Sequence, residues 1–262
     1  EKYLFRGNLE YSDFPQGYYG VGNFTKDQER LEITFRELLV EPLLLRQVSD
    51  GLFVGGGFRY DHFFATKLIE ATDELPEGFD LQDSLGSTSA GIELAISLDK
   101  RDNVVNASKG VFAEFTQGLY GEVLGGTHAF QLSKLDFRYY DKIHPKQVMA
   151  FNFFARYALG DAPVQELSSL GGDFLLRGYQ EDRFRDRLAL FAQSEWRWQA
   201  LKSVGLVGFA GLGRVGDGFN DLALDGLYYS VGAGLRVTVI PSENINLRLD
   251  VAQGFGPVSD FG

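Results

Sequence analysis

The residue best suited to chemistry in this sequence is Arg177, in the stretch Gly171–Tyr179 with the sequence GGDFLLRGY. A guanidinium group is always charged, and it pairs best with a carboxylate that accepts two hydrogen bonds. Large apolar residues, Phe174 to Leu176, directly precede the arginine, although disordered loops are poor in such residues. The pattern predicts a folded loop that packs against the rest of the protein and brings one arginine to a partner.

Residues for covalent catalysis or metal binding are sparse. The chain has no cysteine, which removes disulfides, thiol catalysis and cysteine-based metal sites together. The three histidines, His62, His128 and His144, are widely scattered. An outer-membrane lipase would need a Ser–His–acid arrangement, but no G-x-S-x-G motif is present and no histidine has a motif-placed serine. We therefore predict no enzyme activity, no metal site and no cofactor.

Composition narrows the class of protein further. A length of 262 residues is compatible with one large barrel domain, and a net charge of −11 argues against binding to nucleic acid. The 32 glycines, 14% aromatic residues and only 7 prolines are typical of many strands joined by tight bends. The mean hydropathy of −0.13 resembles that of a soluble protein. A transmembrane β-barrel would have the same value, because its strands alternate apolar and polar residues.

The clearest element expected from the pattern is a strand at Tyr228–Val239. Its odd-numbered residues are all apolar, whereas the even-numbered ones are mostly small or polar and include Arg236. A period of two places these sets on opposite faces of a strand. The next segment repeats the pattern, with a turn at Pro241–Asn244 between them. Similar segments give about eleven expected strands: Tyr3–Tyr11, Leu31–Val40, Leu52–Asp61, Gly91–Asp99, Val111–Tyr120, Ala129–Tyr140, Gln147–Ala158, Leu188–Gln199, Val204–Gly213, Tyr228–Val239 and Asn244–Val251.

The lengths of these segments and of their connections favour an antiparallel transmembrane β-barrel. Many segments approach the 9–11 residues that a tilted strand needs to cross a bilayer. Short turns such as Ile143–Pro145 alternate with long gaps at Glu70–Ser89, Gly160–Asp186 and Gly216–Gly226, as in outer-membrane barrels. A soluble antiparallel β-protein is the alternative. Bacterial single-chain barrels usually have an even number of strands, whereas eleven is odd. We therefore expect a closing strand to lie outside this sequence, together with several strands before its start.

Four stretches resemble the BamA/TamA outer-membrane protein superfamily, also called the bacterial surface antigen family. The four stretches occur in the same order and at similar spacing as in the family, and together they extend over most of the chain. They are Phe14–Asn23 (FPQGYYGVGN), similar to "FP-x-x-FYGIGN"; Asp99, Arg101, Asp102 and Asn103 running to Lys109-Gly110; Gly171, Gly172, Leu176, Arg177, Gly178 and Tyr179, similar to "GG-x-x-x-[VL]RG[FY]"; and Gly234 with Arg236, followed by Arg248 and Asp250.

The resemblance implies a bacterial outer-membrane barrel of 16 strands, of which this chain would supply about the fifth to the fifteenth. A smaller barrel of 12 strands is the alternative. Residues 1–262 would form one barrel domain without a periplasmic POTRA domain, and the loop at 160–186 would fold into the lumen. Family members mostly insert or translocate other proteins, so outer-membrane lipid and unfolded outer-membrane or secreted proteins are the implied partners. A passive pore or a membrane anchor is the other functional class.

The resemblance also implies a partner for the arginine. In the family it pairs with acidic residues on the next two strands. On the first of these, Glu195 lies on the polar face with Gln193 and Arg197, opposite Trp196 and Trp198. Glu195 is therefore the expected partner of Arg177, and the two tryptophans are expected at the lipid interface.

The sequence departs from the family pattern at two positions. Gly211 stands where the family has the second acidic residue, so we expect Glu195 to carry more of the contact. Ala107 stands where the family usually has proline before Lys109-Gly110. The stretch at Asp99–Gly110 would lie near the periplasmic rim, and we assign it a structural role rather than a chemical one.

Overall fold

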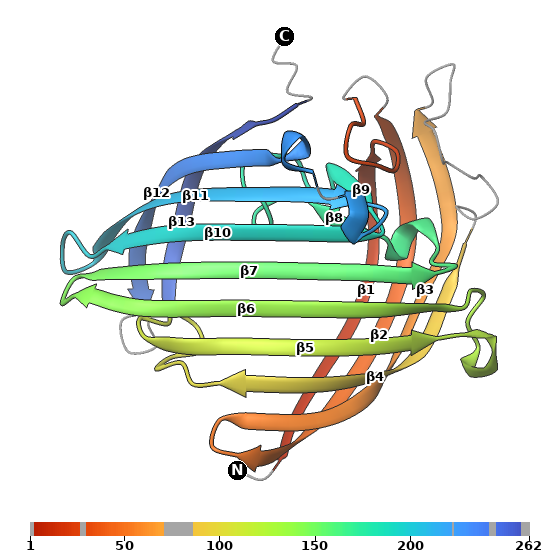
Figure 1. The fold of residues 1–262 in the computed structure, drawn as a ribbon, viewed down its shortest axis with the longest axis horizontal. Helices are drawn as coiled ribbons and strands as arrows, with labels where there is room; N and C mark the ends of the chain where they lie inside the picture. Colours follow the sequence, from red (N-terminus) through yellow and green to blue (C-terminus); the bar gives the residue numbers. More distant parts are fainter. Residues whose placement is uncertain (1–2, 27–29, 71–85, 222, 241–244, 258–262) are drawn as a thin grey trace.

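The computed structural model describes residues 3–26, 30–70 (without the side chains of 65–70), 86–221, 223–240 and 245–257. These residues form one curved, antiparallel sheet of eleven strands and a separate two-stranded ribbon (Figure 1). The sheet strands follow chain order: β1 Tyr3–Tyr18, β2 Leu31–Ser49, β3 Leu52–Glu70, β4 Thr88–Asp99, β5 Gly110–Tyr120, β6 Phe130–His144, β7 Gln147–Gly160, β10 Leu188–Trp198, β11 Val204–Gly216, β12 Tyr228–Ile240 and β13 Ile245–Phe255. The ribbon pairs β8 Ser168–Leu170 with β9 Phe184–Asp186.

All eleven segments expected from the alternating pattern are strands, so the prediction of an antiparallel all-β fold is confirmed. The first three strands are longer than predicted. In β2 the alternation stops near Pro42, which lies opposite Gly7 of β1 but is unpaired toward β3. Proline lacks the N–H group that the ladder needs, which explains this local gap.

The apolar face of the sheet is turned outward. Alternate residues of β13 show this clearly, because Leu247, Leu249 and Val251 are 63–77% exposed. Trp196 and Trp198 stack on each other on the same face, with their ring centroids 6.1 Å apart. No second sheet covers this face within the described ranges. The soluble alternative, in which the apolar face packs against another sheet, is therefore not the observed arrangement.

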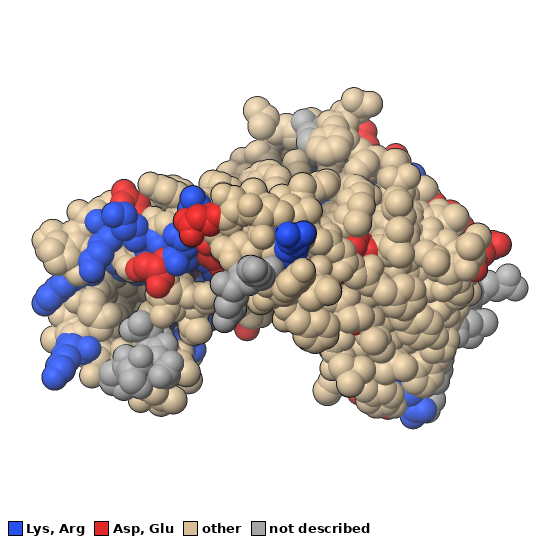
Figure 2. All heavy atoms as spheres, turned by 90° about the horizontal axis from the view of Figure 1, so that it is seen from below, with Lys and Arg blue, Asp and Glu red and all other residues tan. Residues whose placement is uncertain are grey.

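On the outer surface, charged side chains gather mainly at one end of the sheet. Figure 2 shows a broad surface with only a few isolated charged groups, and a cluster of Lys, Arg, Asp and Glu side chains at one end. This is the end of the short turns, such as Pro145–Lys146 between β6 and β7. The opposite end has the long connections, which include residues 161–187 and 217–227. The turn expected at 241–244 lies outside the described residues.

Connection 161–187 lies against the inner face of the curved sheet. Its side chains contact β3 through Arg59, β7 through Arg156, β10 through Glu195 and β13 through Asp250. In the sheet β3 is separated from β13 by seven other strands, so only a segment inside the curve can reach both. Within the described residues, the remaining regular elements are four short 3-10 helices: η2 Glu122–Leu124, η3 Val164–Glu166, η4 Phe219–Asp221 and η5 Leu224–Gly226. No helix in the described residues has the length and apolar content needed to cross a membrane.

Candidate functional site

The arginine loop, which we define as residues 171–179, begins with a tight glycine turn. Gly171 and Gly172 have φ angles of +126° and +87°, a region that side chains other than hydrogen adopt at a cost. The backbone N–H of Gly171 donates to the carbonyl of Leu175 at 2.8 Å, and that of Gly172 to the carbonyl of Tyr179 at 3.1 Å. The two glycines thus close the loop on itself, with Arg177 at its far side.

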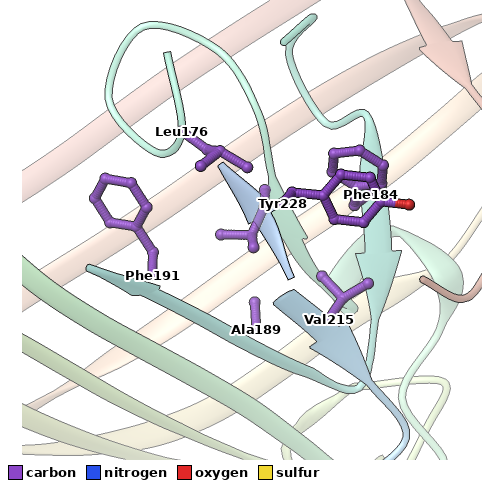
Figure 3. Close-up of a cluster of buried hydrophobic side chains, with 7 residues drawn as sticks. Leu176, Phe184, Ala189, Phe191, Val215 and Tyr228 are labelled. Carbon is purple, nitrogen blue, oxygen red and sulfur yellow. The ribbon is translucent and has the colours of Figure 1, made fainter. Parts of the chain in front are cut away.

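An apolar cluster holds the loop against the sheet (Figure 3). Leu176 is fully buried there among Phe184 of the ribbon, Phe191 of β10, Val215 of β11 and Tyr228 of β12. The backbone of Leu176 has a φ of +73°, which is unfavourable for a residue with a Cβ atom. Burial of the leucine side chain, about 1.5–3 kcal/mol by transfer estimates, offsets this strain. The turn at Leu176 directs the next side chain, Arg177, toward the strands.

Arg177 lies between two carboxylates of the sheet. Its Nη2 atom is 2.6 Å from Oε2 of Glu195 on β10, and its Nη1 atom is 2.6 Å from Oδ2 of Asp250 on β13. Its Nε atom donates to Gln193 at 3.3 Å. The side chains of Arg177, Glu195 and Asp250 are 6%, 9% and 11% exposed, so the ion pairs are shielded from solvent. Asp250 thus provides a second carboxylate for Arg177, although Gly211 stands where the family has its second acidic residue.

Two glycines of β12 explain how Asp250 reaches Arg177. Arg177 rests on the ring of Phe209, with its Cζ atom 3.4 Å from the ring centroid. Phe209 faces Gly232 in the ladder, and Asp250 faces Gly234. A Cβ atom at Gly232 would overlap the Phe209 ring, and one at Gly234 would overlap the Asp250 carboxylate. The absence of side chains at Gly232 and Gly234 therefore leaves the space that the arginine and its partners occupy.

The ion cluster contains more arginines than carboxylates. Glu195 also pairs with Arg197 at 2.7 Å, and Asp250 with Arg236 at 2.5 Å and Arg248 at 3.5 Å. Four arginines thus share two carboxylates, although Arg248 also lies 3.7 Å from the exposed Asp173. Each carboxylate is therefore more critical than any one arginine, because its loss leaves like charges facing each other.

The end of the arginine loop fits against β13. A Cβ atom at Gly178 would lie 2.9 Å from the backbone carbon of Gln253, and Gly178 has a φ of +103°. The next residue, Tyr179, places its ring over Gly254 and donates its hydroxyl to the carbonyl of Tyr229 at 3.2 Å. Burial raises the pKa of Tyr179 to about 12, still further above neutral pH than the ordinary value of 10.

A second ion cluster holds connection 161–187 at its start, and here the connection supplies the carboxylate and the sheet supplies the arginines. Glu166 is only 1% exposed and lies 2.7 Å from Arg59 of β3 and 3.1 Å from Arg156 of β7. Arg156 also donates to the carbonyls of Glu166 and Leu167, at 2.8 Å each. The sequence did not predict this anchor, because one glutamate in a loop carries no periodic signal. The only hint of this anchor in the sequence was the pair Arg59 and Asp61, two charged residues on the same face of β3.

The stretch at 99–110 forms a compact turn at the short-turn end. Asp99 accepts two side-chain hydrogen bonds from Arg101, and Asp102 accepts backbone hydrogen bonds from Ser108 and Lys109. Although burial alone would raise the pKa of Asp102, hydrogen bonds from Ser108 and Lys109 outweigh it and hold the pKa below its usual value. Asn103 accepts from two backbone N–H groups at 2.8 Å, and Gly110 has a φ of +107°.

One side chain connects this turn with the ion cluster. Arg197, which pairs with Glu195, also donates to the carbonyl of Ala107 at 3.2 Å. Stretches that are far apart in the sequence are therefore joined around Glu195. A polar cavity of about 970 Å³ opens beside them at the short-turn end. Within the described residues no group of three or more acidic or histidine side chains could hold a metal ion.

The comparisons with known proteins agree with this architecture. A family model for the Omp85 superfamily domain matches residues 55–253, more than half of the chain. The structure is similar to that of BamA from Haemophilus ducreyi lacking POTRA domains 1-3, with a TM-score of 0.64 and 14% identity over 97% of this chain and 59% of that one. It is also similar to CdiB from Acinetobacter baumannii, with a TM-score of 0.63 and 13% identity over 97% of this chain and 48% of that one. No curated protein matches in sequence.

These matches fix the fold and the family. The chain spans about half to three fifths of the two solved structures. Because the two solved structures share only 13–14% identity with this chain, they support the fold alone. The assignment to the superfamily rests on the family model. The predicted resemblance is confirmed: the chain belongs to the Omp85 superfamily and is a bacterial outer-membrane protein with a β-barrel fold of the BamA and CdiB type.

Proposed function

We propose that this protein assists the insertion or translocation of other proteins at the outer membrane, without covalent chemistry. We further propose that residues 1–262 form a single barrel domain whose connection 160–186 occupies the lumen. Its partners would be outer-membrane lipid, through the exposed apolar face, and unfolded outer-membrane or secreted proteins. Membership of the Omp85 superfamily supports this class of function over others.

The observation that carries the proposal is the way in which the arginine loop is held. Arg177 reaches Glu195 and Asp250 by ion pairs, and no ladder of strand pairing joins residues 171–179 to the eleven-stranded sheet. While they are intact, the shielded ion pairs of Arg177 fix one position of the loop. Glu195 and Asp250 can also pair with other arginines of the sheet when Arg177 leaves. Such a loop can hold a lumen closed and still move without unfolding of the barrel.

The test is a folding-assistance assay with the full-length protein in liposomes. An unfolded test barrel is added, and its protection from protease is followed over time against empty liposomes. We expect faster protection with the wild-type protein and a loss of most of this acceleration with Arg177→Ala. Arg30→Ala, which removes an arginine 47% exposed at the side chain, is the matched control. Equal rates with and without the folded wild-type protein would refute assistance of insertion.

A passive pore is the second candidate, and the polar cavity of about 970 Å³ at the short-turn end favours it. A pore function predicts steady ion conductance across a planar bilayer with no effect on the test barrel. It also predicts that Arg177→Ala raises conductance, because the loop would block the lumen less. Conductance without assistance of folding would select this candidate over the first.

A further inference from the structure

Residues 18–25 carry part of the FPQGYYGVGN motif, and the proposed function leaves this motif without a role. The segment leaves β1 at the end of the long connections, where side chains are usually exposed. Instead Tyr18, Tyr19, Asn23 and Thr25 are only 2–9% exposed. A buried amide such as that of Asn23 is costly unless its hydrogen bonds are satisfied. Its partners therefore indicate what the segment holds.

Asn23 joins the segment to β11 and β12. Its Nδ2 atom donates to the carbonyl of Gly226 at 2.8 Å, and its Oδ1 atom accepts the backbone N–H of Val215 at 3.2 Å. Its own carbonyl accepts the hydroxyl of Tyr228 at 2.5 Å. One residue thus binds the end of β11, the connection after it and the start of β12.

The same segment binds connection 161–187. The backbone N–H of Gly22 donates to the carbonyl of Arg185 in the ribbon at 2.8 Å. Arg183 donates to the side chain and the carbonyl of Thr25 at 2.9 and 2.6 Å, and its guanidinium lies over the ring of Tyr19 at 4.5 Å. Tyr19 also donates its hydroxyl to Gln180, directly after the arginine loop.

The partners of residues 18–25 lie far from β1 in the strand order of the sheet. β1 and β2 lie at one side of the sheet order, and β11 and β12 lie near the other. β1 and β13 do not pair within the described residues. In Figure 1 the connection after β1 lies next to β9, in agreement with the bridge between Gly22 and Arg185. Residues 18–25 therefore span from one side of the curved sheet to the other, across the ribbon.

We propose that residues 18–25 are a brace, with Asn23 at its centre, that holds the arginine loop inward and ties the two sides of the sheet together at the long-connection end. The brace must detach from Val215 and Gly226 before the ribbon and the arginine loop can leave the lumen. Asn23 is thus a positioning residue for the loop. The proposal depends on the fold alone, and it would stand if the protein were a passive pore.

The test is hydrogen–deuterium exchange of the full-length protein in detergent micelles, read by mass spectrometry. Asn23→Ala removes both side-chain hydrogen bonds. We expect at least tenfold faster exchange in peptides covering 180–186 and 214–228, and unchanged exchange in β5 and β6. Asn220→Ala, at an exposed position of the β11–β12 connection, is the control and should leave both regions unchanged.

Tyr228→Phe keeps the test decisive if Asn23→Ala fails to fold. It removes only the hydroxyl that reaches Asn23 and keeps the ring stacked on Phe184, whose centroid lies 3.8 Å away. We expect the same regions to exchange faster, to a smaller extent. Unchanged exchange in 180–186 in folded Asn23→Ala or Tyr228→Phe protein would overturn the brace. So would an equal increase in β5 and β6, because the effect would then be global.

Discussion

Gly234 faces Asp250 across the β12–β13 ladder, and the Asp250 carboxylate occupies the space that a side chain at Gly234 would fill. Gly234→Ala should therefore displace the carboxylate from Arg177 and Arg236 and destabilise the protein by about 1–3 kcal/mol, the usual cost of leaving a buried polar group unsatisfied. Urea unfolding of the full-length protein in detergent micelles measures this loss.

Gly208→Ala is the matched control for that change. Gly208 lies in the neighbouring strand β11, and a Cβ atom there would meet nothing within 4 Å. Because alanine loses less conformational freedom on folding than glycine, the control should be neutral or slightly stabilising. Equal losses at both positions would mean that Gly234 matters for strand formation and not for Asp250.

Arg177 and Asp250 should be energetically coupled. Their atoms are 2.6 Å apart in a site that is largely shielded from solvent. Arg177→Ala and Asp250→Asn should each destabilise the protein, but the double variant should cost about 1–3 kcal/mol less than the sum. The same cycle with Glu195→Gln should give a similar coupling. Strict additivity in urea unfolding would show that Arg177 does not hold the loop through these carboxylates.

The excess of arginines predicts a suppressor. In Asp250→Asn the positive charges of Arg177, Arg236 and Arg248 lose their shared partner. Adding Arg236→Gln removes one of the facing charges, so we expect it to restore about 1 kcal/mol of stability in that background. In the wild-type background the same change should destabilise. A loss in both backgrounds would show that repulsion among the arginines is negligible.

Gly178 provides a test of how the loop fits against β13. Gly178→Ala combines an unfavourable φ of +103° with a Cβ atom 2.9 Å from Gln253, so it should release the loop. Gly125→Ala is the control, since Gly125 has a φ of +94° but open space around it. Limited proteolysis should cut the arginine loop faster in Gly178→Ala than in Gly125→Ala. Equal cleavage would mean that backbone strain alone matters.

Alternation was enough to predict where the strands of the sheet lie. Segments such as Tyr228–Val239 expose every second residue to the outside, all of these residues are apolar, and this period of two appears directly in the sequence. The extension of β2 beyond Val40 could not be predicted, because Pro42 interrupts the alternation. Strand bounds depend there on the neighbours in the sheet and not on the local pattern.

The ion cluster was partly visible in the sequence. Arg177 and Glu195 were expected to meet because the family pairs this arginine with acidic residues of the next two strands, and Glu195 lies on the polar face of the first; their atoms lie 2.6 Å apart. Asp250 was expected only as part of a stretch that resembles the family, and its contact with Arg177 was not predicted, because that contact depends on two glycines of β12 that leave space for the carboxylate. Glu166 carried no signal, and Asn23 was visible only as the last residue of the FPQGYYGVGN motif, because a single polar residue in a connection shows its role only through partners distant in sequence.

The turn at 99–110 predicts a local dependence on pH. The pKa of Asp102 is lowered in the fold, since hydrogen bonds from Ser108 and Lys109 outweigh the effect of burial. A lowered pKa means that the charged form stabilises the turn above the ordinary value of 3.8, and that this contribution is lost as pH falls through the lowered value. Asp102→Asn cannot titrate, so its turn should lack this step. Amide exchange of residues 103–110, corrected for intrinsic rates, should rise below pH 4 in the wild type and stay flat in the variant. A parallel rise in both proteins would assign the acid sensitivity to other groups.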